Sequence, residues 1–115
     1  MSTLHSAAWS FISGFVLLGA PLSAANAVTI KSDIVYGTVD KTQLRMDIAF
    51  PTKQSDPIPC IVVIHGGAWM QGNKSMHTDD IKYFAKQGYV SVSIGYRLAP
   101  SHRFPAQVED VKCAI

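Results

Sequence analysis

The run of five apolar residues at 60–64, CIVVI, constrains the fold of this chain more than any other segment. It has no polar residue at alternate positions, and such a run is typical of a strand that is buried on both faces of a parallel sheet. The run ends abruptly at His65, Gly66 and Gly67. Because a parallel sheet needs helices on both faces, the run predicts a domain of the α/β class.

The segments before this run predict a hairpin. Residues 33–39 and 44–50 flank a polar turn at 40–42, and apolar and polar residues alternate along 44–50. This period of two is the pattern of a half-buried strand, so we expect the two segments to pair antiparallel. Residues 51–59 are rich in Pro and polar side chains and predict a surface connection.

The segments after the glycines predict two helices and a further strand. Residues 78–87 form the first helix, and Gly88 is expected to end it in a left-handed conformation. Residues 89–96 alternate large and small side chains, which predicts a strand with one small face for close helix packing. The two parallel strands should be joined by a right-handed crossover. The last segment, 104–115, has apolar residues at helical spacing: Phe104, Val108, Val111 and Ile115.

The first 27 residues differ in composition from the rest, because every Lys, Arg, Asp and Glu lies after Ala27. Residues 7–18 form a short apolar core, and the small residues at 25–27 fit the rule for cleavage after Ala27. Residues 1–27 therefore predict a cleavable signal peptide and an exported protein, periplasmic or secreted, whose folded part is 28–115. An uncleaved anchor is the alternative, but the core is shorter than the roughly 20 residues of a spanning helix, so no stable membrane span is expected.

Charge and cysteine content exclude several classes of function. Ten Lys and Arg stand against eight Asp and Glu, and the basic residues are scattered, which argues against nucleic acid as a partner. The four His and two Cys form no cluster with metal-ligand spacing, so we expect neither a metal nor another cofactor. Cys60 and Cys113 lie among apolar residues and are expected to be small buried side chains. In an oxidising compartment they could also pair, if their Cα atoms lay within about 7 Å.

Two glycines at the carboxyl end of a buried strand suggest a site made by the main chain. Gly66 and Gly67 allow backbone angles closed to other residues and let a ligand atom approach N–H groups. Such groups can stabilise an oxyanion, and one donor is worth about 2.7–4 kcal/mol in the transition state. Two alternatives stay open from these residues alone: a tight turn in which the glycines serve geometry only, and a phosphate loop. Bulky Trp69 and the absence of the usual glycine spacing disfavour the phosphate loop.

A second pair of motifs, GYRLAP at 95–100 and FPAQVEDVK at 104–112, combines with HGGAW at 65–69. With these motifs the sequence resembles the α/β-hydrolase esterases over residues 34–115. The resemblance is to the hormone-sensitive-lipase-like carboxylesterases and to the secreted carbohydrate esterases that remove acetyl or feruloyl groups. It implies a partial α/β-hydrolase fold: an N-terminal hairpin and a parallel β-α-β-α unit, without the nucleophile strand and the rest of the sheet.

The resemblance also implies roles for individual residues. Gly66, Gly67 and Ala68 would form the oxyanion-hole loop, with the N–H groups of Gly67 and Ala68 as donors. His65 would support this loop and would not be the base of the catalytic triad. Trp69 would help to wall the acyl pocket, and ordinary packing of its large ring is an alternative of equal weight.

Arg97 and Asp110 belong to the motifs that carry the resemblance. We hypothesise a salt bridge between them that orients the turn at residues 96–98. The alternative is two separately solvated charges, which is the commoner situation for such residues.

No G-x-S-x-G occurs in the chain, and in the family the nucleophilic Ser comes after the next strand, followed by its acid and its base. We therefore expect a serine esterase for a small ester or an acylated carbohydrate, of which this chain is an N-terminal part that is inactive alone. The family strand order leaves one edge of the 60–64 strand open, so 28–115 expressed alone should fold poorly. The alternatives are a short non-catalytic binding or interaction module on the same scaffold and a peptidase of the same fold.

Overall fold

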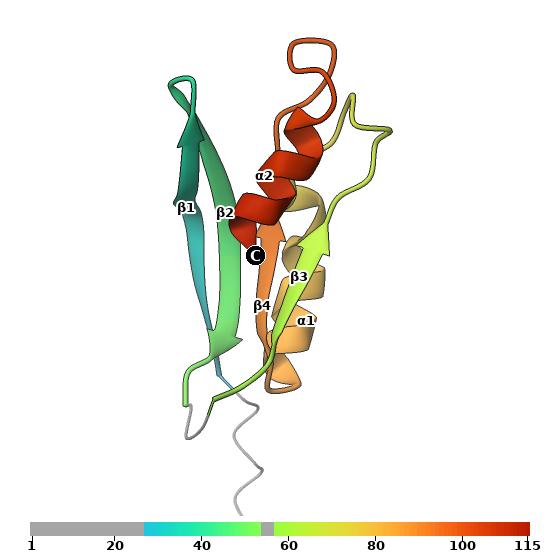
Figure 1. Ribbon diagram of the computed structural model, residues 1–115. Coiled ribbons are helices and arrows are strands. Elements are labelled where there is room, and N and C mark those ends of the chain that lie inside the picture. The colour runs from blue at the N-terminus through green and yellow to red at the C-terminus, as the bar shows by residue number, and fades with distance from the viewer. Residues whose placement is uncertain (1–26, 54–56) are drawn as a thin grey trace, which may run out of the picture.

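The computed structural model describes residues 27–53 and 57–115, so the predicted signal peptide, apart from Ala27, lies outside the described residues. These residues form a four-stranded sheet with helices against it (Figure 1). The strands are β1 (Val28–Val39), β2 (Thr42–Pro51), β3 (Cys60–Ile64) and β4 (Val90–Ile94). The helices are the short 3-10 helix η1 (Lys74–His77), α1 (Thr78–Lys86) and α2 (Ala106–Ala114).

The strand order is β1-β2-β4-β3, in which β3 and β4 are parallel and the other pairs are antiparallel. The predicted hairpin is present, with longer strands than the sequence pattern indicated. Its turn consists of Asp40 and Lys41, which have φ values of 45° and 68°. Positive φ at both turn residues matches the right-handed twist of the strands they join. The predicted α/β class is confirmed by this mixed sheet and its helices.

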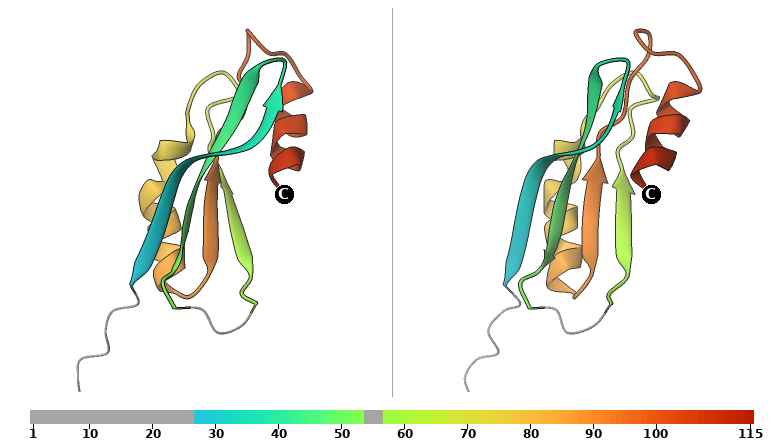
Figure 2. Two further views of the ribbon diagram at one scale, coloured as in Figure 1. Left: turned by 90° about the vertical axis from the view of Figure 1, so that its left-hand side faces the viewer. Right: turned by 60° about the vertical axis from the view of Figure 1, so that its left-hand side comes forward.

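The two longer helices lie on opposite faces of the sheet, as Figure 2 shows. On the α1 face, Ser91 and Ser93 of β4 are completely buried. Their small side chains let α1 approach, and Ile81 and Ala85 of α1 pack with Ala49 of β2 in a fully buried cluster. The expectation that the small face of this strand admits a helix is therefore confirmed. Gly88 ends the α1 segment with a φ of 97°, also as expected.

The uninterrupted apolar run is not the most deeply buried strand. Cys60 and Ile64 at the two ends of β3 are exposed, and the residues between them are half-buried. The most deeply buried strand is β4, one of the two inner strands, in which residues 91–94 are all buried. The prediction of full burial for residues 60–64 is wrong within the described residues, because none of their strands pairs with the second edge of β3.

The two cysteines are both free and both exposed, so the prediction that they are buried is wrong. Cys60 begins the edge strand, where the described residues offer it few neighbours. Cys113 lies on α2, and its Sγ lies against Gly37 of β1. Apolar sequence neighbours did not imply burial here, because both residues lie at margins of the packed layers.

The apolar spacing of residues 104–115 predicts α2 correctly but not the face that is buried. Phe104 and Ile115 are 67% and 83% exposed, whereas the buried residues of the helix are Ala106, Gln107 and Asp110. Asp110 binds Arg97, as described below, and Gln107 donates through Nε2 to the carbonyl oxygen of His102 at 2.7 Å. None of the helices formed by the described residues is both long and apolar enough to cross a membrane.

Candidate functional site

A tight loop follows β3 at its carboxyl end and contains the glycines noted in the sequence. Gly67, Ala68 and Trp69 have consecutive positive φ values of 116°, 54° and 61°. The loop closes on the carbonyl oxygen of Gly67, which accepts hydrogen bonds from the N–H groups of Met70 at 3.0 Å and Gln71 at 3.1 Å. A side chain at position 67 would place Cβ 2.0 Å from the carbonyl oxygen of Gln71. Glycine at 67 is therefore a requirement of the fold.

Gly66 differs from its neighbour, because a Cβ built on it would meet no atom within 4 Å. The φ of Gly66 is not in the left-handed region either, unlike that of Gly67. Nothing in the described residues therefore requires glycine at this position. The interpretation of the glycines as a purely geometric turn accounts for Gly67 and leaves Gly66 unexplained.

The side chain of His65 holds the first peptide unit of this loop. Its Nδ1 lies 2.8 Å from the carbonyl oxygen of Gly66, and since a carbonyl only accepts, Nδ1 carries the proton. A peptide unit is planar and trans, so fixing the Gly66 carbonyl also fixes the direction of the Gly67 N–H on its opposite side. In the same way, the two hydrogen bonds to the Gly67 carbonyl fix the N–H of Ala68.

The N–H groups of Gly67 and Ala68 donate to no acceptor in the described part of the chain. Each is oriented by a hydrogen bond at the carbonyl of its own peptide unit. Main-chain donors that are held in place and lack a partner can bind a negatively charged oxygen without reorganising. The geometry can therefore provide two adjacent donors to an anionic ligand atom.

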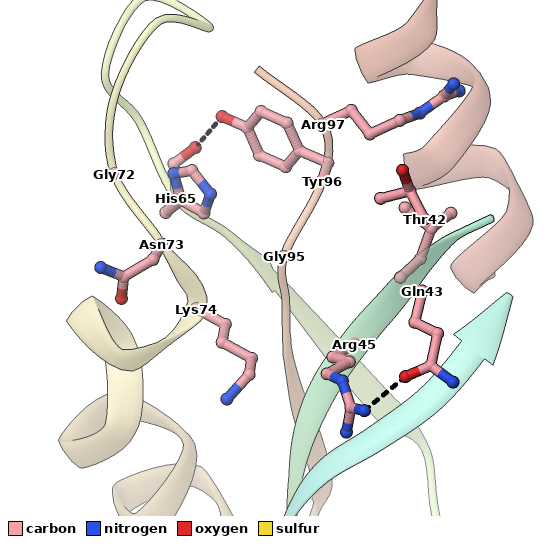
Figure 3. Close-up of a pocket in the computed structure, with 11 residues that line it drawn as sticks. Thr42, Gln43, Arg45, His65, Gly72, Asn73, Lys74, Gly95, Tyr96 and Arg97 are labelled. Atoms are coloured by element: carbon pink, nitrogen blue, oxygen red, sulfur yellow. Dashed lines mark hydrogen bonds between the residues drawn. The ribbon is translucent and has the colours of Figure 1, made fainter. Parts of the chain in front are cut away.

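His65 itself is almost completely buried, at 2% exposure. Its ring stacks on the ring of Tyr96 with centroids 4.3 Å apart and an angle of 8° between the planes. The hydroxyl of Tyr96 donates to the carbonyl oxygen of His65 at 2.7 Å, and Figure 3 shows this bond. This position fits a residue that supports the loop and gives His65 no access to a substrate.

Trp69 lies beside an apolar hollow of about 230 Å³. Its side chain is 48% exposed and stacks on Phe104 with ring centroids 5.9 Å apart. Its carbonyl oxygen accepts from the N–H of Ala99 at 2.8 Å, which fixes the far end of the loop. Trp69 thus forms an exposed wall of this hollow and is not packed inside the core. The hollow is lined by Ile64, Trp69, Tyr96, Gln107, Val108, Val111 and Lys112.

Arg97 and Asp110 form the hypothesised ion pair, and the alternative of two solvated charges is wrong. The guanidinium binds the carboxylate through Nε and Nη2 at 2.8–3.1 Å, and the backbone N–H of Arg97 also donates to it at 2.8 Å. The Asp110 side chain is fully buried. The hydrogen bond to Asp110 raises the pKa of Arg97, against a smaller effect of burial. The pair holds the segment after β4 in the orientation in which Ala99 reaches the loop.

A charged cluster that the sequence pattern did not predict is centred on Lys74. Lys74 also lines a second hollow of about 250 Å³, which Figure 3 shows. Lys74 Nζ binds Oδ1 of Asp47 at 2.8 Å and Oδ1 of Asp33 at 3.0 Å. Burial alone would lower the pKa of Lys74, but the bonds to both carboxylates outweigh it and raise that pKa. The same contact lowers the pKa of Asp33. The cluster ties the β1-β2 hairpin to η1, directly after the loop.

The alternation along β2 had placed Asp47 on its polar face, yet Asp47 is only 5% exposed. The face of β2 that carries Asp47 also carries Ala49, which packs against α1. Asp47 is compensated there by Lys74, which lies 27 positions away in the sequence. The one sequence signal for a buried charge was that Asp47 stands between two apolar positions of the strand. The sequence pattern could not identify Lys74 as its partner, because that contact depends on the fold. Among the described residues, no group of three or more His, Cys, Asp or Glu side chains is placed to hold a metal ion.

Solved structures of esterases share the fold of this chain. Esterase B from Lactobacillus rhamnosis matches with a TM-score of 0.68 and 27% identity, over 78% of this chain and 29% of that chain. Thermogutta terrifontis esterase 2 phosphonylated by cyclosarin matches with a TM-score of 0.67 and 29% identity, over 79% of this chain and 35% of that chain. The described residues therefore have the architecture of an α/β-hydrolase of the esterase class.

The chain belongs to the BD-FAE family, which matches residues 46–115. The esterase LipC of Mycobacterium tuberculosis is 42% identical over 88 residues, which cover 71% of this chain and 20% of LipC. The carboxylesterase NlhH of the same species is 32% identical over 75 residues, which cover 64% of this chain and 24% of NlhH. The chain thus spans about a fifth to a quarter of the length of these curated relatives. The predicted resemblance to hormone-sensitive-lipase-like esterases is confirmed.

Proposed function

We propose that this protein hydrolyses carboxylic esters through a serine acyl-enzyme, with residues 66–68 as its oxyanion-hole loop. The observation that carries the proposal is the pair of N–H groups of Gly67 and Ala68, which find no acceptor among residues 27–53 and 57–115. Each is held by a hydrogen bond at the carbonyl of its own peptide unit. Ester hydrolysis passes through a tetrahedral intermediate that bears a negative oxygen, which is the species such donors stabilise. The names of the similar proteins, which are esterases and carboxylesterases, support the same chemistry.

The mechanism divides between this loop and a catalytic Ser. No G-x-S-x-G occurs in these 115 residues, so the loop residues act on a nucleophile supplied from outside this sequence. After Ser attacks the ester carbonyl, the new oxyanion accepts from Gly67 and Ala68, and water later releases the acid. Each donor contributes about 2.7–4 kcal/mol to the transition state. His65 fixes the peptide that carries the first donor and takes no proton from the nucleophile.

The substrate class that fits best is a small ester or an acylated carbohydrate. The apolar hollow that Trp69 lines has a volume of about 230 Å³, and Trp69 directly follows the second proposed donor, Ala68, in the loop. Trp69 then acts as a wall of the acyl pocket, which its half-exposed ring and its stacking on Phe104 support. We also propose that residues 1–27 are a cleaved signal peptide and that the enzyme works outside the cytoplasm; the leader composition supports this.

The test is the turnover of chromogenic acetyl and butyryl esters by the complete gene product, followed by inactivation with an organophosphate. Esterase 2 of Thermogutta terrifontis is phosphorylated by paraoxon, so the same reagent should inactivate this protein stoichiometrically if a Ser is its nucleophile. Absence of turnover on these esters and on acetylated or feruloylated sugars would favour a non-catalytic module. Residues 28–115 alone should show no turnover. Activity of that segment would overturn the assignment of the nucleophile to a part outside it.

A further inference from the structure

We propose that Tyr96 is a positioning residue for the oxyanion-hole loop and sets the direction of the Gly67 N–H through His65. The inference rests on the proposed function, since it gives that loop a second layer of support. Tyr96 does not touch the donors themselves. Its two contacts, one from the hydroxyl and one from the ring, both reach His65.

The hydroxyl contact fixes the start of the loop. Tyr96 Oη donates to the carbonyl oxygen of His65 at 2.7 Å, and that carbonyl belongs to the peptide unit that enters Gly66. Because the peptide is planar, this bond sets the orientation of Gly66 relative to the end of β3. Tyr96 is 8% exposed, and burial raises the pKa of its hydroxyl, so the hydroxyl keeps its proton and remains a donor.

The ring contact fixes the imidazole. The two rings are nearly parallel, with centroids 4.3 Å apart, and His65 is 2% exposed, so its ring cannot rotate without displacing Tyr96. The Nδ1 of this imidazole is the donor that orients the peptide between Gly66 and Gly67. Tyr96 therefore orients both the peptide unit before Gly66 and, through His65, the next unit, which carries the first proposed oxyanion donor.

Tyr96 can hold His65 in place because the residues that follow Tyr96 in the chain are themselves fixed by hydrogen bonds. The backbone N–H and guanidinium of Arg97 bind the buried carboxylate of Asp110. Further along, the N–H of Ala99 binds the carbonyl of Trp69 at 2.8 Å. Residues 96–99 thus contact the loop at both of its ends, at His65 and at Trp69. This two-point contact makes the segment after β4 the template for the loop.

The experiment compares Tyr96→Phe with Tyr83→Phe in the complete gene product. The first change removes the hydroxyl and keeps the ring, and the second removes a hydroxyl from an exposed tyrosine on α1 that is 60% accessible. We expect Tyr96→Phe to lower kcat per organophosphate-titrated active site about 10-fold, less than the roughly 100-fold to 1,000-fold loss when a donor is removed outright. KM should change less than about twofold, because the donors act on the transition state. Tyr83→Phe should match the wild type.

A second measurement does not depend on activity. Amide hydrogen exchange over residues 65–72 should be about fivefold faster in Tyr96→Phe, the factor for loss of a hydrogen bond worth about 1 kcal/mol. Unchanged exchange, or kcat per titrated site within twofold of the wild type, would overturn the inference even if the variant melts earlier. If the wild type hydrolyses no ester, the proposed function fails, and the exchange measurement still decides whether Tyr96 positions the loop.

Discussion

Replacing Gly67 by Ala is the most direct perturbation of the proposed oxyanion hole, because it changes the path of the backbone without removing any polar side chain. The added Cβ would lie 2.0 Å from the carbonyl oxygen of Gln71, well inside van der Waals contact. That oxygen is part of the backbone, so the loop itself has to move by more than an ångström. A φ of 116° is also strained for any residue with a side chain.

The expected losses of stability and of activity follow from the contacts that this movement breaks. The Gly67 carbonyl would lose its hydrogen bonds from Met70 and Gln71, each worth about 0.5–1.5 kcal/mol. Those two bonds orient the Ala68 N–H, so the displaced loop also misplaces an oxyanion donor. We expect a fall in unfolding free energy of about 1–3 kcal/mol, the sum for two such bonds. We expect kcat to fall about 100-fold to 1,000-fold, as for a lost donor.

The assay measures kcat on a short-chain chromogenic ester and the unfolding free energy in denaturant, both with the complete gene product. Gly66→Ala is the matched control for stability, because its Cβ would meet nothing within 4 Å and its φ is not left-handed. Gly66→Ala should leave the unfolding free energy unchanged within error. A Gly67→Ala protein that retains wild-type kcat would refute the assignment of the donors to this loop. A large loss of stability in Gly66→Ala would refute the packing argument.

Two further predictions concern the charged pairs. Asp110→Asn removes the buried carboxylate that binds the guanidinium of Arg97 and leaves only the longer contact with Glu109 at 3.8 Å. It should lower the unfolding free energy by about 3–5 kcal/mol in denaturant titrations. A loss below about 1 kcal/mol, the value of a surface pair, would contradict the buried ion pair. Lys74→Met should lower the melting temperature most near neutral pH. Lys74 lowers the pKa of Asp33, so this contribution is present above the unfolded pKa of about 3.9 and is lost as the pH falls through the lower folded value. The difference in melting temperature between Lys74→Met and the wild type should therefore shrink below about pH 4. A constant difference in melting temperature from pH 7 to pH 3 would show that the ion pair with Asp33 contributes nothing to stability.

Local signals in the sequence predicted the elements whose formation depends on near neighbours. The turn at Asp40 and Lys41, the end of α1 at Gly88 and the sharp exit of β3 into its glycines all follow from residue types at adjacent positions. The ion pair between Arg97 and Asp110 could be predicted because both residues belong to the motifs that carry the family resemblance.

Features that depend on distant neighbours could not be predicted in this way. Burial of Asp47 requires Lys74, and the contact between Tyr96 and His65 joins residues 31 positions apart. The apolar content of 60–64 correctly indicated a strand, but its exposure depends on which strand occupies its second edge. A linear pattern specifies what a strand prefers to contact and not whether the contact is made.

The proposed donors belong to the main chain, which separates the chemistry of the site from the identity of its side chains. Substitutions at Ala68 or Trp69 by any residue other than proline change the side chains of the loop but remove no N–H group. They are limited mainly by the left-handed backbone at both positions, which costs a residue with a side chain roughly 1–2 kcal/mol. Substrate preference can therefore diverge at the Trp69 wall during evolution, or be redesigned in the laboratory, while the machinery that stabilises charge is inherited unchanged.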